Sequence, residues 1–157
     1  MDQPIVTYAG FWKRFVAYLI DSFVLSAAGA LVVLVIGGIF GLSILSALSG
    51  DADSTVAIIA AAASAIMLAI ACVVVAGWLY HALMESSTNQ ATLGKMALGI
   101  KVTDLDGNRI SFAKATGRYF GKIVSGMILY IGFIMAGFTV KKQALHDIMA
   151  SCVVVNK

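Results

Sequence analysis

The chain has 157 residues, of which 61% are hydrophobic and 12% charged, and its formal net charge is +3. A typical soluble domain is about half apolar and about a quarter charged, and a soluble fold this small could not bury so much apolar surface. The composition therefore predicts an integral membrane protein. The eleven Lys and Arg residues are separated by apolar segments rather than gathered in one basic face, so we do not expect nucleic acid as a partner.

Two long apolar stretches predict transmembrane helices at about residues 15–40 and 55–82. Each is longer than the roughly 20 residues that a spanning helix needs. The only charged residue inside the first stretch is Asp21, and the second stretch contains none. A cleavable signal peptide is an alternative for the first stretch, because Lys13 and Arg14 resemble its basic flank. An acid in the hydrophobic core and the length of the apolar run favour a membrane anchor instead.

The distribution of basic residues predicts the orientation of these helices. Lys and Arg precede the first span and recur through residues 85–118, whereas none lies between the two spans. The positive-inside rule then places the N-terminus and residues 85–118 in the cytoplasm. The connecting loop, with Asp51 and Asp53, is expected outside.

A third apolar segment, residues 119–140, contains Lys122 and several glycines, so it either crosses the membrane or re-enters. A single crossing would place Lys141 and Lys142 outside, against the positive-inside rule. This conflict favours a re-entrant or shallow segment, with residues 141–157 in the cytoplasm.

The polar segment between the second and third apolar stretches carries a hairpin pattern. Residues 100–103 and 109–112 are short strand-like runs on either side of the turn sequence Asp-Gly-Asn at 106–108. A two-stranded ribbon is marginal by itself. We therefore predict that the β-branched run at 153–155 pairs with the strand around residues 100–103.

Three motifs in order resemble the RDD family of small bacterial membrane proteins. They are AGFWKRFVAYLID at residues 9–21, TLGKMALGIKV at 92–102 and QALHD at 143–147. The resemblance implies one compact membrane domain over residues 1–157, whose naming Arg and two Asp are Arg14, Asp21 and Asp147. It also implies a poorly defined biochemical function, for which transport is the usual suggestion.

The chemistry of these three residues allows two interpretations. Arg14 and Asp21 are seven residues apart, so a helix places them on one face about 10 Å apart along its axis. An ionised carboxylate at that depth costs about 3 kcal/mol unless it is paired or hydrated. Asp21 is thus either a proton or small-cation site or an acid held by hydrogen bonds. We predict that Arg14 bridges Asp21 and Asp147, directly or through water.

Five further residues are candidates for supporting roles: His81, Glu85, Gly94, Lys95 and His146. The first two are four residues apart on one helix face, but nothing in the sequence brings His146 to them, so no metal or cofactor is expected. Gly94 is expected in a turn, and Lys95 is expected to contact anionic lipid headgroups. No catalytic constellation is recognisable, so we do not expect an enzyme.

These observations lead to two functional hypotheses. The first is a multi-pass inner-membrane protein of a bacterial cell that transports protons or small cations through the Arg14, Asp21 and Asp147 unit. A homo-oligomer is expected, because two or three spans enclose little aqueous path. Small residues at four-residue spacing supply candidate packing faces: Gly37 and Gly41, and Ala57, Ala61, Ala65 and Ala69. The alternative is a non-transporting interaction or assembly module that recruits another membrane protein and whose polar triad is structural.

Overall fold

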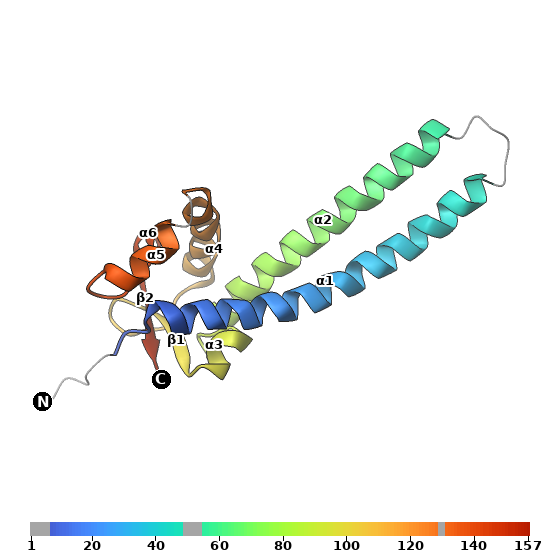
Figure 1. Ribbon diagram of the computed structural model, residues 1–157. Helices are drawn as coiled ribbons and strands as arrows, with labels where there is room; N and C mark the ends of the chain where they lie inside the picture. The colour runs from blue at the N-terminus through green and yellow to red at the C-terminus, as the bar shows by residue number, and fades with distance from the viewer. Residues whose placement is uncertain (1–6, 49–54, 129–130) are drawn as a thin grey trace, which may run out of the picture. The chain divides into compact units, whose positions relative to one another are not determined.

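The computed structural model describes residues 7–48, 55–128 and 131–157 (Figure 1). The elements in chain order are α1 (Phe11–Leu48), α2 (Thr55–Ser86), α3 (Leu93–Ala97), β1 (Ile100–Asp104), α4 (Phe112–Met127), α5 (Ile131–Phe138), α6 (Leu145–Met149) and β2 (Cys152–Asn156). Two compact units result, one of residues up to Ser22 with Trp78–Lys157, the other of Phe23–Gly77. The loop residues Asp51 and Asp53 lie outside the described residues.

Two helices are long and apolar enough to cross a membrane, as predicted from the sequence. The qualifying segments are Phe11–Leu42 of α1 and Thr55–Ser86 of α2, each of 32 residues. At 1.5 Å per residue such a helix is about 48 Å long, whereas the hydrocarbon core is about 30 Å thick. Each helix is therefore longer than the hydrocarbon core is thick, so α1 can begin and α2 can end in polar surroundings.

The described residues of the unit Phe23–Gly77 belong to the apolar arms of these two helices. Its described residues carry no charge, and most of its large side chains are exposed, as is expected of a surface in contact with lipid. Ala65 and Ala69 of the predicted alanine ridge are buried, whereas Ala57 is exposed. The ridge thus forms a packing face over part of its predicted length.

A two-stranded antiparallel sheet organises the other unit. Val102 of β1 lies opposite Val154 of β2, so the predicted pairing of the C-terminal run with residues 100–103 is confirmed. The residues before α1 pair with the other edge of β2, because Ala9 N donates to Val154 O at 2.9 Å and Asn156 N donates to Thr7 O at 2.9 Å. The start of the chain, β1 and β2 therefore lie side by side (Figure 1).

The predicted hairpin partner of β1 is wrong. Residues 109–112 form no strand, and Ser111 instead caps α4, its side chain accepting from Lys114 N at 3.2 Å. The turn itself is present, with Gly107 at a φ of +85° and Asp104 Oδ1 accepting from Asn108 N at 2.8 Å. The edge of β1 that faces the turn pairs with Gln90 instead, because Gln90 O accepts from Val102 N at 2.7 Å and Gln90 Nε2 donates to Val102 O at 3.1 Å.

Helices α4 and α5 correspond to the third apolar segment and lie at 103° to each other, with residues 129 and 130 between them outside the described part. The next helix, α6, returns to pack on α4, where a Cβ added to Gly121 would lie 3.0 Å from His146 Cβ. Because β1 precedes α4 and β2 follows α6, pairing of the strands requires both ends of this segment to lie on one side of the membrane. The bent pair has the length and composition of a broken span or a re-entrant loop, and the strand pairing leads us to expect the re-entrant form.

Cysteine labelling tests this topology. In a chain whose Cys72 and Cys152 are replaced by Ala, we expect an impermeant maleimide to reach Asn108→Cys and Lys157→Cys from the same side of sealed vesicles. Val56→Cys, at the other end of α2, is the control and should be labelled from the opposite side. A Lys157→Cys label that appears together with the Val56→Cys label would mean that the third segment crosses.

Candidate functional site

Asp147, in the first turn of α6, is fully buried and accepts hydrogen bonds on both oxygens. Oδ1 accepts from Arg118 Nε at 2.7 Å and forms an ion pair with Arg118 Nη2, also at 2.7 Å. Oδ2 accepts from Arg14 Nη1 and from Ala144 N, the latter at 3.1 Å. One carboxylate thereby joins α1, α4 and α6.

Glu85, in the last turn of α2, is a second buried carboxylate. Its Oε2 accepts from Arg118 Nη1 at 2.6 Å, and its Oε1 pairs with Lys95 Nζ and lies 3.6 Å from Lys122 Nζ. Arg118 thus bridges the two acids. We call these six side chains the ion network: Arg14, Glu85, Lys95, Arg118, Lys122 and Asp147.

Charge pairing compensates the cost of burying these groups. A buried ion is costly unless it is paired and hydrogen-bonded, and a planar guanidinium can serve two carboxylates at once. Burial by itself would raise the pKa of the Asp147 carboxyl, but Arg118 and Arg14 outweigh it and hold that pKa below its usual range. Burial lowers the pKa of Lys95 to about 7, although Glu85 attracts its charge.

Asp21 belongs to a different arrangement. Its Oδ1 accepts from Tyr80 Oη and from Gly94 N, both at 2.8 Å, and its Oδ2 accepts from Thr92 Oγ1 at 2.6 Å. In the described part of the chain Arg14 contacts Asp147 and not Asp21. The predicted direct contact of Arg14 is therefore found at Asp147, whereas Asp21 accepts from neutral donors of α2 and the start of α3.

The two histidines lie at different acids. His81 Nδ1 is 3.9 Å from Glu85 Oε1, whereas His146 Nε2 is 3.4 Å from Asp147 Oδ1. Burial lowers the pKa of His146 to about 3, so its imidazole is neutral at physiological pH. Across the described residues, His, Cys, Asp and Glu side chains form no group of three that could hold a metal ion.

Gly94 and Lys95 have roles that differ from the predicted turn and headgroup contact. Gly94 lies in α3, where a Cβ would collide with the backbone oxygen of Ala17 in α1. Lys95 is 7% exposed and pairs with Glu85, which holds its ammonium inside the unit. The short motif around these residues therefore packs α3 against α1 and places the Lys95 ammonium beside the buried Glu85 carboxylate.

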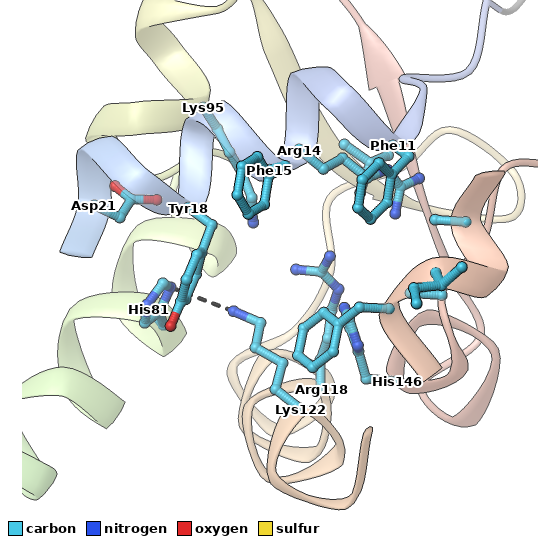
Figure 2. A pocket seen from close by; sticks show the side chains of 15 residues that line it. Phe11, Arg14, Phe15, Tyr18, Asp21, His81, Lys95, Arg118, Lys122 and His146 are labelled. Atoms are coloured by element: carbon cyan, nitrogen blue, oxygen red, sulfur yellow. Dashed lines mark hydrogen bonds between the residues drawn. The ribbon is translucent and has the colours of Figure 1, made fainter. Parts of the chain in front are cut away.

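A cavity of about 370 Å³ lies against the ion network (Figure 2). Arg14, Arg118 and Lys122 supply cationic groups to it, and aromatic and aliphatic side chains of α1 and α5 form its walls: Phe11, Phe15, Tyr18, Phe133 and Ile134. Arg14 Nη2 is buried and has no hydrogen-bond partner among the residues that the structure describes. The cavity is therefore basic on one side and apolar on the other.

Sequence reasoning missed two members of the network. From the sequence, Arg118 was used only as one of the basic residues that indicate the cytoplasmic side, before the third apolar segment. Lys122 was noted only as a charged residue within that segment. A local signal does exist, because Ala115, Arg118, Gly121 and Ser125 recur at three- and four-residue spacing and form the buried face of α4. A charged residue on an otherwise small-residue helix face is a candidate for a buried ion pair.

Two helices of the chain are apolar and long enough to span a membrane, and the chain continues from them into a small unit built around buried ion pairs. These features define a helical membrane protein. The chain belongs to the RDD family, whose sequence profile matches residues 8–151. It is 39% identical to the "Uncharacterized protein YxaI" of Bacillus subtilis (strain 168), with all of both chains covered. It is 32% identical to the "Uncharacterized membrane protein YteJ" of the same organism, over 96% of this chain and 82% of that one. No solved structure matches the chain.

Removal of the bridging guanidinium tests the importance of the ion network. In Arg118→Met, Glu85 and Asp147 both lose a donor, so we expect the free energy of unfolding to fall by about 3–5 kcal/mol. The measurement is denaturant unfolding of the protein in neutral detergent micelles. Arg109→Met removes an exposed guanidinium and should change stability by less than about 0.5 kcal/mol. Equal effects of the two substitutions would show that the network does not stabilise the fold.

The close approach of α3 to α1 predicts that Gly94 tolerates no side chain. Gly94→Ala would place a methyl group against the Ala17 backbone and separate the Gly94 amide from Asp21, so we expect strong destabilisation or loss of folded protein. Gly117→Ala in α4 is the control, because its Cβ meets nothing within 4 Å and alanine favours a helix by up to about 1 kcal/mol. The yield of monodisperse protein after mild heating distinguishes them, and normal yield of Gly94→Ala would contradict this packing.

Proposed function

We propose that this protein binds an anion in the basic cavity beside the ion network and acts as the charge-selecting subunit of a membrane transport assembly. Several copies are part of the proposal, because two spanning helices per chain enclose no aqueous path by themselves. The apolar arms of α1 and α2 supply the surfaces through which such copies would meet, in a bilayer or against another membrane protein.

One observation carries the proposal: every oxygen of the carboxylates in and beside the cavity already accepts from a donor of the chain, whereas one guanidinium nitrogen has no acceptor among the described residues. Every oxygen of Asp21, Glu85 and Asp147 already faces at least one donor of the chain. Arg14 Nη2, in contrast, has no acceptor among the described residues. A cation would have to share carboxylate oxygens that already accept from donors of the chain, whereas an anion would accept from a donor that has no acceptor.

The balance of charge agrees with this preference. Four basic side chains of the ion network share two carboxylates, and the Asp21 carboxylate at the cavity still leaves the cations in the majority. Lys122 Nζ lies 3.6 Å from Glu85 Oε1 and 3.4 Å from His81 Nδ1, so it is held more loosely than Arg118. The proposal therefore reverses the sign of the solute that the sequence led us to expect, a proton or small cation.

Flux measurements with the purified protein in liposomes test the proposal. We expect uptake of radiolabelled inorganic phosphate above that of empty liposomes, without matching signals from entrapped pH-sensitive and Na⁺-sensitive dyes. Lys122→Gln should reduce this uptake at least tenfold, because it removes a loosely held cation from the cavity. Lys114→Gln, on the exposed face of the same helix, is the matched control and should behave as the unsubstituted protein.

Other results would contradict the proposal. Proton or Na⁺ flux without phosphate flux would support the cation hypothesis drawn from the sequence, with Asp21 as its first candidate residue. The absence of any flux, together with no detectable phosphate binding, would support an assembly module.

The assembly module is the second candidate, and the surroundings of Asp21 favour it. Three neutral donors from α2 and the start of α3 hold this carboxylate, and both of its oxygens accept a hydrogen bond, an arrangement that fixes the geometry of these elements. Asp21→Asn would then impair folding, because an amide cannot accept on both of its terminal atoms. A folded, inserted Asp21→Asn protein that has lost only transport would argue against this purely structural role.

A further inference from the structure

We infer that the cavity beside the ion network binds an anionic amphiphile, that is, a phosphate or carboxylate head group on an aliphatic chain. This inference rests on the proposed anion site and adds the class of molecule that the site takes. It follows from three features of the cavity: a fixed donor, an apolar wall and a position at the end of a membrane span.

The fixed donor is the guanidinium of Arg14. Its Nε donates to Ala9 O at 2.9 Å and its Nη1 pairs with Asp147, so two of its three nitrogens are held by the chain. The third, Nη2, is buried without an acceptor in the described part of the protein. A guanidinium that is held in this way loses little further conformational entropy when it binds an oxyanion. Lys122 Nζ, from α4, provides a second and more adjustable charge at the same cavity (Figure 2).

The apolar wall is larger than a small inorganic ion requires. Phe15 and Tyr18 of α1 and Ile134 of α5 line the cavity and remain 41%, 58% and 46% exposed. A cavity of about 370 Å³ lies within the range of about 300–1,000 Å³ that is typical of pockets for drug-sized ligands. An alkyl chain against these side chains would remove apolar surface from water, which a bare phosphate ion would not do.

The positions of Arg14 and Tyr18 along α1 determine how the ligand is oriented. Arg14 follows the first residue of the spanning segment by three positions, about 5 Å along the helix, and Tyr18 follows it by seven, about 10 Å. The cationic end therefore lies at the depth of lipid headgroups, and the apolar wall extends toward the hydrocarbon. A membrane phospholipid and a soluble alkyl phosphate share this chemistry, and both can enter with the head at Arg14 and Lys122.

Titration calorimetry of the full chain in a neutral maltoside detergent tests the inference. The probes are octyl phosphate, inorganic phosphate for the head alone and octyl glucoside for the chain alone. We expect octyl phosphate to bind at least tenfold more tightly than inorganic phosphate, and octyl glucoside not to compete.

Two substitutions separate the two parts of the site. Lys122→Gln should weaken octyl phosphate binding about tenfold, whereas Lys114→Gln on the exposed face of α4 should not change it. Ile134→Ser should weaken binding of octyl phosphate but not of inorganic phosphate. Ile131→Ser, an exposed residue of the same helix that does not line the cavity, is its matched control. Circular dichroism of each variant verifies that the helices are retained.

Nanodiscs distinguish the two sources of the ligand. If the occupant is a membrane lipid, octyl phosphate should bind more weakly in discs that contain one fifth phosphatidylglycerol than in discs of phosphatidylcholine alone. Equal affinity in the two kinds of disc would assign the site to a soluble amphiphile. Either result supports the inferred class of ligand.

Two results would overturn the inference, and they differ in what they leave standing. Equal affinities for inorganic phosphate and octyl phosphate would remove the amphiphile while retaining the proposed anion site. No binding of either phosphate, or octyl phosphate binding that Lys122→Gln and Lys114→Gln change equally, would remove both proposals.

Discussion

The bridge that Arg118 makes between Glu85 and Asp147 is the interaction on which the small unit depends. These two acids lie at the end of α2 and the start of α6, and Arg118 is in the middle of α4. Neither carboxylate could remain ionised in so buried a place without such a partner. The pairing therefore fixes three elements, and through Arg14 it also fixes the first turn of α1.

The position of this bridge relative to the spans explains why the small unit can hold so many charges. Both α1 and α2 are longer than the hydrocarbon core is thick, so the first turn of one and the last turn of the other can lie outside the hydrocarbon. The acid and bases there pair with residues of α3, α4 and α6. In the chain, β1 precedes α4 and β2 follows α6. The pairing of these strands therefore holds together the two ends of the segment that contains α4, α5 and α6.

The surroundings of Asp21 and the ion network differ in the kinds of groups that hold the carboxylates. Asp21 is held by hydroxyl and amide donors, which fix geometry and bring no opposite charge. The ion network holds more cations than carboxylates and leaves one guanidinium nitrogen without an acceptor in the described chain. The family is named for one Arg and two Asp residues. In this chain Asp21 is held by neutral donors, whereas Arg14 and Asp147 belong to the ion network.

The sequence by itself determined the features that depend on composition and local chemistry. The length of the apolar runs specified two spanning helices, and three short motifs specified the family. The β-branched residues at 153–155 were recognisable as a strand, and the turn at 106–108 was recognisable from its glycine. In each case the information lies within a few neighbouring residues, and the physical preference is strong enough to survive in the folded chain.

Only the tertiary structure decided which charged residues meet. Arg14 and Asp147 are 133 residues apart, and Glu85 and Arg118 are 33 apart, so no spacing rule relates them. The same limit explains the wrong hairpin: the local turn indicated residues 109–112, but Gln90 occupies that edge of β1 and the C-terminal strand pairs on the other edge. It also explains Asp21, whose partners depend on the close approach of Gly94 to α1. Pairing of buried charges and of strands is set by which segments pack together, and that choice depends on the whole chain.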